Sequence, residues 1–270
     1  MPKIRRKSMN RRGFLASAAA FGAMISNIAS GQTTGPLELL MTRSRMISVP
    51  GEGAQLLSAF LAHPPLSDEG GEAWPCVILV HDRWGLTDDI KATAEALAGQ
   101  GYIVLAPDLY EGEVTTEPTE ALFKARNLTA QSVGETLQAW QAWAIKSQGA
   151  SGKVGICGWG FGGGWALTAS LASPFDATVL YYGDVERTVK ELRNLNGPVL
   201  GHFGTRDLHV NKFNVTKYTE NMTKAGRIAK VHWYDASNNF AMPSGTHFDE
   251  EDRDQAWTRT VSFFAEFLAD

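Results

Sequence analysis

The residues best placed for chemistry surround one glycine-rich turn, the GWGFGG segment at 158–163. An apolar run ends at this turn and a helical pattern rich in small residues follows it. That order predicts a strand, a sharp turn and a helix. Such a turn places one residue at the carboxyl end of a strand, beside backbone N–H groups and a helix N-terminus. This geometry is suited either to binding a phosphate or to presenting a nucleophile.

Two functions are compatible with the glycine spacing. Gly158, Gly160 and Gly163 match the G-x-G-x-x-G dinucleotide fingerprint, and Asp184 follows about 20 residues later, where a ribose-binding acid is expected. Alternatively, residues 158–162 form a nucleophile elbow of the G-x-S-x-G type, whose central residue carries the attacking side chain. Here the central residue is Gly160. The position where hydrolase chemistry would begin therefore has no side chain.

The elements that must position this turn alternate between strand and helix patterns. Predicted strands cover 45–49, 55–62, 74–80, 102–106, the run before the turn, 177–182, 199–203 and 228–234. Predicted helices cover 88–97, 117–147, the segment after the turn, 185–195, 215–225 and 255–268. The alternation predicts a single α/β domain with a mostly parallel sheet and helices on both faces. Polar loops follow several strands, and in such sheets the ligand crevice lies at the carboxyl ends.

The N-terminus has the features of an export signal. Arg11 and Arg12 precede Phe14-Leu15, and a small, weakly apolar run follows from Ala16 to Ala29. This is the pattern of a twin-arginine signal, and the run is too short and too rich in small residues for a membrane span. We expect residues 1–31 to be a signal peptide, residues 32–270 to be the mature domain, and the mature protein to be periplasmic or secreted.

Composition limits the partners of the mature chain. The 270 residues are 44% hydrophobic and 20% charged, which is typical of a globular protein. Residues 1–31 contain six of the 25 Lys and Arg residues and no acid, so 19 basic and 29 acidic residues remain. This negative balance argues against nucleic acid and anionic membranes as partners. Cys76 and Cys157 fall in predicted strands and match no metal-ligand pattern, so we expect free core thiols, with a disulfide as the alternative.

From about Leu57 to Leu268 the chain resembles the dienelactone hydrolase family, small α/β-hydrolases with a Cys-His-Asp triad. The resemblance lies in the order and spacing of seven landmarks: HDRWG at 81–85, PDLY at 107–110, the turn at 158–163, YYG at 181–183, HFGTRD at 202–207, VHWY at 231–234 and AWTRT at 256–260. It implies an α/β-hydrolase fold. It also disfavours the dinucleotide interpretation, which requires the glycine turn after the first strand rather than after about 150 residues.

The resemblance also assigns the site, position by position. The family's triad acid matches Asp207, but its nucleophilic Cys matches Gly160 and its general-base His matches Asn238. The acid that holds the resting thiol matches Asp82, which is one methylene shorter than the usual Glu. Met242 stands where a carboxylate-binding arginine is expected. The resemblance thus predicts a degenerate triad.

Without a thiolate no acyl-enzyme can form, and Asn cannot transfer a proton near neutral pH. The backbone part of the site does not depend on side-chain identity. In the family the oxyanion hole uses two N–H groups that match Phe161 and Arg83. We therefore expect a pocket for a lactone, ester or carboxylate, walled by Trp84 and Trp159, in a member with low activity or none. An active hydrolase that uses Asp82 or a loop histidine, and a nucleotide-binding protein, are the alternatives.

The histidines and the acidic run are assigned more ordinary roles. His81, His202 and His232 lie at or inside predicted strands and are expected to be hydrogen-bonded structural residues. His209 and His247 lie in loops, where either could replace the missing base. The spacing of Asp207 and His209 is no specific metal signature, so no metal or other cofactor is predicted. The acidic run at 249–252 predicts the start of a helix.

Overall fold

A computed structural model describes residues 43–51, 55–65 and 73–269 of the chain, and they lie in one compact unit that spans Met41–Asp270. The eight strands of these residues form one sheet in the order β1-β2-β4-β3-β5-β6-β7-β8. The pairs β1–β2 and β2–β4 are antiparallel, whereas every other pair is parallel. The bounds are β1 Arg43–Pro50, β2 Leu56–His63, β3 Trp74–Val80, β4 Ile103–Pro107, β5 Ala150–Trp159, β6 Ala177–Tyr181, β7 Val199–Gly204 and β8 Ala229–Tyr234.

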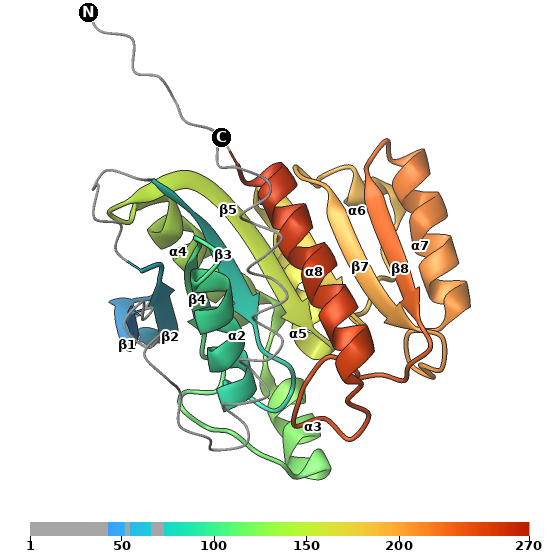
Figure 1. Ribbon diagram of the computed structural model, residues 1–270, viewed down its shortest axis with the longest axis horizontal. Helices are drawn as coiled ribbons and strands as arrows, with labels where there is room; N and C mark the ends of the chain where they lie inside the picture. The colour runs from blue at the N-terminus through green and yellow to red at the C-terminus, as the bar shows by residue number, and fades with distance from the viewer. Residues whose placement is uncertain (1–42, 52–54, 66–72, 270) are drawn as a thin grey trace, which may run out of the picture. The chain divides into compact units, whose positions relative to one another are not determined.

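Seven helices lie among the described residues: α2 Asp88–Ala98, α3 Pro118–Asn127, α4 Ala130–Lys146, α5 Phe161–Ala172, α6 Val189–Leu192, α7 Lys212–Lys224 and α8 Glu250–Phe267. Figure 1 shows α2 and α8 in front of the sheet. Helices α4 and α5 pack against each other and against the central strands β3 and β5. The predicted α/β class and mostly parallel sheet are thus confirmed.

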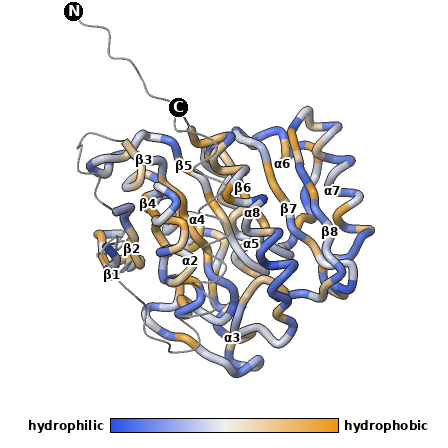
Figure 2. The backbone as a smooth tube through the Cα atoms, viewed as in Figure 1, coloured by the Kyte–Doolittle hydropathy of each residue, from blue (hydrophilic) through white to orange (hydrophobic). Residues whose placement is uncertain are grey.

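The side-chain alternation of β5 shows how the sheet separates its two helix layers. A Cβ atom at Gly155 would lie 2.8 Å from the Phe264 ring of α8. The neighbouring Val154 and Ile156 belong instead to the buried cluster that contains Trp140 of α4. Successive strand residues point to opposite faces, so α8 and α4 cover opposite faces of the sheet. The apolar colouring of the central strands in Figure 2 agrees with this two-sided burial.

The predicted helix over 117–147 is wrong in one respect, because the structure divides it into α3 and α4. Thr129 accepts a hydrogen bond from the backbone N–H of Ser132, and Ser132 accepts one from the N–H of Thr129. This reciprocal cap starts a new helix. The apolar periodicity continues across the break, which is why the pattern alone did not show it.

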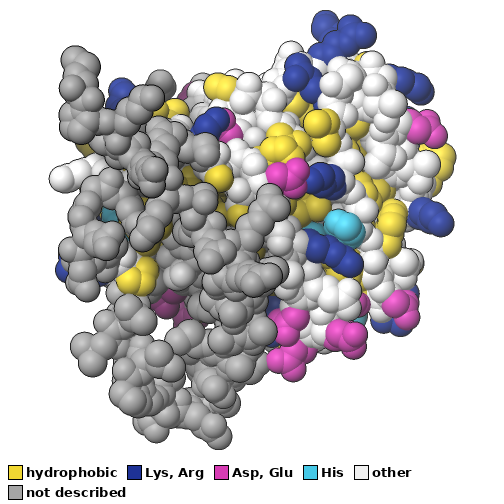
Figure 3. Space-filling view, turned by 45° about the horizontal axis from the view of Figure 1, so that its top comes forward, with side chains coloured by type: hydrophobic (Ala, Val, Ile, Leu, Met, Phe, Trp, Pro, Cys, Tyr) yellow, Lys and Arg dark blue, Asp and Glu magenta, His cyan; other side chains and the backbone are white. Residues whose placement is uncertain are grey.

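Other local predictions are confirmed. The first two predicted strands pair as an antiparallel hairpin. The acidic run starts α8, where the Asp249 side chain accepts the backbone N–H of Asp252. On the face shown in Figure 3, basic and acidic side chains are interspersed over the described surface. Within the described ranges, no helix is long and apolar enough to cross a membrane. The predicted signal peptide lies outside the described residues.

Candidate functional site

The glycine-rich turn forms a sharp elbow between β5 and α5. Gly160 has φ +50° and ψ −113°, a conformation that glycine adopts more easily than other residues. Its backbone N–H donates to the Tyr181 carbonyl oxygen at 2.9 Å, which fixes the turn against the end of β6. The turn therefore lies at the carboxyl edge of the sheet, as the sequence predicts.

The carboxylate of Asp82 occupies the space in front of Gly160. A Cβ atom built at residue 160 would lie 2.7 Å from Asp82 Oδ1 and 2.9 Å from Oδ2. Asp82 is the second residue after the end of β3, and only 7% of its surface is exposed. The Asp82 carboxylate thus fills the volume in which a nucleophile at position 160 would begin.

The same carboxylate also uses both predicted oxyanion donors. Asp82 Oδ1 accepts the backbone N–H of Arg83 at 2.7 Å and that of Phe161 at 3.0 Å. The Phe161 N–H belongs to the first turn of α5, where unpaired N–H groups and the helix dipole favour a negative charge. An oxygen of the protein itself therefore accepts both N–H groups that the resemblance matches to the oxyanion hole.

His81 fixes the backbone from which Asp82 projects. The Leu109 N–H donates to His81 Nε2 at 3.1 Å, so the proton of the neutral ring lies on Nδ1, which donates to the Asp82 carbonyl oxygen at 2.6 Å. Burial lowers the pKa of His81, which keeps the ring neutral. The predicted structural role of His81 is confirmed. That of His202 is also confirmed, since its ring nitrogens lie within hydrogen-bonding distance of Tyr234 and Thr260.

Two tyrosines that were not predicted as site residues lie near Asp82. Burial, and then the charge of Asp82, raises the pKa of Tyr110 to about 12. Tyr182 is fully buried, has φ +42°, and has its pKa raised by the same two causes. Both belong to landmark segments at strand ends, PDLY and YYG, which was the signal available in the sequence.

Asp207 and Asn238, which the resemblance matches to the triad's acid and histidine, contact each other. The amide Nδ2 of Asn238 donates to Asp207 Oδ2 at 2.9 Å. Asp207 Oδ1 accepts the backbone N–H groups of His209 and Val210 at 2.7 and 3.1 Å. The acid is thus oriented as it would be toward a histidine. Its partner is an amide that cannot act as a base near neutral pH.

A cavity of about 180 Å³ opens beside Asp82, between the N-terminus of α2 and the loop after β8. The loop is held to α2 because the backbone N–H of Ser244 donates to Asp89 Oδ2 at 2.9 Å. The lining contains Asp82, Trp84, Gly85, Thr87, Asp89, Ile90, Thr115, Thr116, Asn239, Met242, Ser244, Gly245 and Thr246. Trp84, which was predicted as a pocket wall, is part of this lining, as is Met242. Several other predicted site residues are not: Gly160, Phe161, Arg83, Asp207 and Asn238.

Trp159 does not line this cavity. It is buried and stacks on Tyr181, with ring centroids 5.3 Å apart. The physical reason is strand alternation: Trp159 lies four residues after Gly155 on β5 and so points to the α8 face. Its predicted role as a pocket wall is replaced by a role in core packing.

Neither cysteine replaces the absent nucleophile. Cys76 and Cys157 are free and buried. Burial raises the pKa of Cys76 to about 11 and that of Cys157 well above its ordinary value. A thiol becomes a nucleophile as its thiolate, which both environments suppress.

The two loop histidines do not line the cavity, and the described residues form no metal centre. His209 and His247 are both exposed, and neither lines the cavity. Among the residues that the structure describes, no three His, Cys, Asp or Glu side chains are grouped as metal ligands. The geometry also disfavours a nucleotide, because the Asp82 carboxylate occupies the α5 N-terminus where a phosphate would bind. Asp184, the candidate ribose-binding acid, is paired with Arg187 at 3.0 Å.

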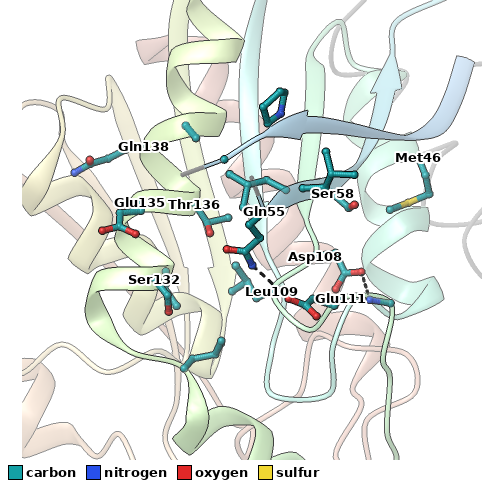
Figure 4. A pocket seen from close by; sticks show the side chains of 18 residues that line it. Met46, Gln55, Ser58, Asp108, Leu109, Glu111, Ser132, Glu135, Thr136 and Gln138 are labelled. Carbon is teal, nitrogen blue, oxygen red and sulfur yellow. Dashed lines mark hydrogen bonds between the residues drawn. The ribbon is translucent and has the colours of Figure 1, made fainter. Parts of the chain in front are cut away.

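A larger groove of about 1020 Å³ lies elsewhere, between the β1–β2 hairpin and α4 (Figure 4). Its acidic groups are partly used within the protein. Asp108 accepts the backbone N–H groups of Tyr110 and Gly112, and Glu111 accepts the Gln55 amide. None of the predicted site residues lines this groove, so it is separate from the elbow.

We predict that Asp82→Asn stabilises the fold at neutral pH. Burial raises the pKa of Asp82, although the two backbone donors oppose the shift. A raised pKa means that the native state favours the protonated form of Asp82. The contribution of protonated Asp82 to stability is therefore complete below the ordinary carboxyl pKa and is lost as the pH rises through the raised pKa. The amide oxygen of Asn can accept both N–H groups without a charge. We expect a melting temperature about 2–4 °C higher, equivalent to roughly 1 kcal/mol in a domain of this size.

The measurement is thermal unfolding of both proteins between about pH 8 and pH 4, the range that ends near the ordinary carboxyl pKa. The gain should shrink as the pH falls. Asp88→Asn is the matched control, because the Asp88 side chain lies in the first turn of α2 and is 99% exposed. A gain of equal size at every pH would contradict a charge effect at Asp82.

Comparisons with known proteins identify relatives of this chain in one family. The model of the dienelactone hydrolase family matches residues 57–268. The chain is 26% identical over 201 residues to carboxymethylenebutenolidase 1 of Cupriavidus pinatubonensis, covering 71% of this chain and 86% of that protein. It is 28% identical over 204 residues to the carboxymethylenebutenolidase of Pseudomonas putida, and the match covers 71% of this chain and 85% of that protein.

Solved structures agree in fold. A putative dienelactone hydrolase from Klebsiella pneumoniae superposes with a TM-score of 0.76 at 23% identity, covering 84% of this chain and 99% of that one. A dienelactone hydrolase-like promiscuous phosphotriesterase from metagenomic libraries also gives 0.76, at 19% identity, covering 85% and 100%. At these identities the structural matches concern the fold alone.

Proposed function

This chain belongs to the dienelactone hydrolase family, and we propose that it is a member that binds a small molecule at the family's site with little or no triad-type hydrolysis. The observation that carries the proposal is the position of Asp82. Its carboxylate lies where the nucleophile would begin and accepts both N–H groups of the expected oxyanion hole. A substrate carbonyl would have to displace a bound carboxylate before any attack.

The other triad positions support the same proposal. Gly160 offers no atom to form an acyl-enzyme, and the buried thiols of Cys76 and Cys157 are held protonated. Asn238 completes a hydrogen bond to Asp207 but cannot accept and return a proton. The cavity beside Asp82 nevertheless remains, with aromatic, apolar and hydrogen-bonding groups in its lining. Such a mixture is typical of small-molecule sites.

A hydrolase of changed mechanism is the second candidate, because Asp82 Oδ2 forms no hydrogen bond with the described residues. A carboxylate oxygen of this kind could activate a water molecule. However, Asp82 cannot hold the oxyanion donors and leave them to a substrate carbonyl at the same time. The two roles therefore compete in the observed conformation.

An activity assay on the purified chain tests the proposal. We expect no turnover of p-nitrophenyl acetate or of simple lactones above the buffer rate, under conditions in which an active family member is readily measured. Treatment with a thiol reagent should change nothing. Hydrolysis that Asp82→Asn abolishes, but that thiol reagents do not affect, would reject the proposal in favour of the changed mechanism.

We also propose that residues 1–31 direct export by the twin-arginine route, on the basis of Arg11, Arg12 and the small-residue run after them. A reporter fused to this segment should reach the periplasm of a bacterial host. Lysine at both arginine positions should retain it in the cytoplasm.

A further inference from the structure

The cavity beside Asp82 is acidic. Asp82 and Asp89 both line it, and the lining contains no Lys, Arg or His. Within the described part of the chain, neither carboxylate forms an ion pair with a basic side chain. The guanidinium of Arg83 lies over the Trp84 ring, 4.9 Å from the centroid, and does not line the cavity. Its charge opposes the rise in the pKa of Asp82 that burial causes, but it forms no ion pair with the carboxylate.

Each carboxylate keeps one oxygen free of intramolecular hydrogen bonds. Asp82 uses Oδ1 for the backbone donors, and Asp89 uses Oδ2 for Ser244, so that Asp82 Oδ2 and Asp89 Oδ1 have no partner among the described residues. Asp82 is more than nine-tenths buried. Burial disfavours an unpaired carboxylate, so a cationic ligand at this oxygen would stabilise the charged form of Asp82.

The remaining lining adds an apolar surface and hydroxyl groups. Trp84, Ile90 and Met242 are the apolar side chains, whereas four threonines and Ser244 supply hydroxyl groups. At roughly 15 Å³ for each water-sized group, a cavity of about 180 Å³ holds about a dozen non-hydrogen atoms. The volume suits a small amphiphilic compound rather than a polymer.

We infer that this cavity binds a small organic cation, an amine with an apolar body, whose ammonium group pairs with Asp82 and Asp89. The inference rests on the proposed binding function of the same site and specifies that its ligand is positively charged. An anionic ligand such as a lactone carboxylate would face two carboxylates with no basic side chain in the lining, and Met242 offers it no hydrogen bond. The apolar body of the amine packs against Trp84, Ile90 and Met242.

Isothermal titration of the full chain with three matched probes tests the inference. The probes are 2-phenylethylamine, 2-phenylethanol and 3-phenylpropanoate, which share a phenyl body and differ in charge. We expect the amine to bind at least about tenfold more tightly than the alcohol, because a charge-assisted hydrogen bond is stronger than a neutral one. We expect the carboxylate not to bind, and the amine to bind less tightly as salt is added.

Two variants locate the site. Asp82→Asn and Asp89→Asn should each weaken amine binding about tenfold or more, whereas Asp88→Asn should not, because Asp88 is exposed and paired with Lys91. Binding of the carboxylate or the alcohol in preference to the amine would overturn the charge assignment but leave the proposed binding function standing. Failure of the amine to bind would also overturn the assignment. Turnover of esters by the native chain would instead contradict the proposed function, whichever probe binds.

Discussion

The double variant Gly160→Cys/Asn238→His is expected to remain inactive until Asp82 is also replaced by Ala. The new Cβ atom at residue 160 would lie 2.7 Å from Asp82 Oδ1, and Asp82 is held in place by two backbone N–H groups. Removal of the carboxylate frees both the space for the thiol and the two oxyanion donors. Since one oxyanion donor contributes about 10²–10³ to kcat, we expect the triple variant to exceed the double variant by at least about 100-fold on p-nitrophenyl acetate.

The matched control is Gly160→Ala/Asn238→His/Asp82→Ala, which has the same open oxyanion hole but no thiol. It should show only background hydrolysis, and a thiol reagent should inactivate the triple variant alone. Triad groups act as a unit, so Asp207→Ala in the triple variant should remove most of the gain. Equal activity of the double and triple variants would show that Asp82 does not block the site.

Gly162→Ala is expected to destabilise the fold strongly. Gly162 is the second residue of α5, and a Cβ atom there would lie 2.2 Å from the Val80 carbonyl oxygen and 2.4 Å from that of His81. Both atoms are backbone, so the start of α5 must move away from β3. Overpacking of this kind costs about 3 kcal/mol or more, which lowers the melting temperature by roughly 6–12 °C. The Phe161 N–H would move with the helix, so amine binding should also weaken.

Gly164→Ala, two residues further along α5, provides the control. A Cβ atom at Gly164 would lie 3.5 Å from the nearest atom, an ordinary contact with Asp184. Alanine in place of a helical glycine without a clash stabilises by about 0.5–1 kcal/mol. Thermal unfolding should therefore show shifts of opposite sign for two substitutions that differ by half a turn of one helix. Equal shifts would indicate that the close approach of α5 to β3 does not control stability.

The sequence by itself determined the sheet, the elbow and the glycine at the elbow's centre. Alternating apolar runs and helical periodicities are local, because each depends on residues a few positions apart. The glycines at 158–163 specify a close approach that only glycine allows, and Gly160 without a side chain is visible directly. The order of the landmarks was enough to place Asp207 and Asn238, which the structure brings within 2.9 Å.

Only the tertiary structure decided what occupies the site. Asp82 and Phe161 are 79 residues apart, and Ser244 and Asp89 are 155 apart, so no local pattern encodes either contact. Whether Asp82 acts as a base in the pocket or fills the oxyanion hole depends on its side-chain rotamer and on the close approach of α5 to the end of β3. Trp84 and Trp159 are indistinguishable as side chains in the sequence. Strand alternation buries Trp159, whereas Trp84 lies in a loop and lines the cavity. The acidic character of the cavity is likewise a property of the assembled loops. Asp82 and Asp89 line one cavity only when α2 packs beside the β8–α8 loop.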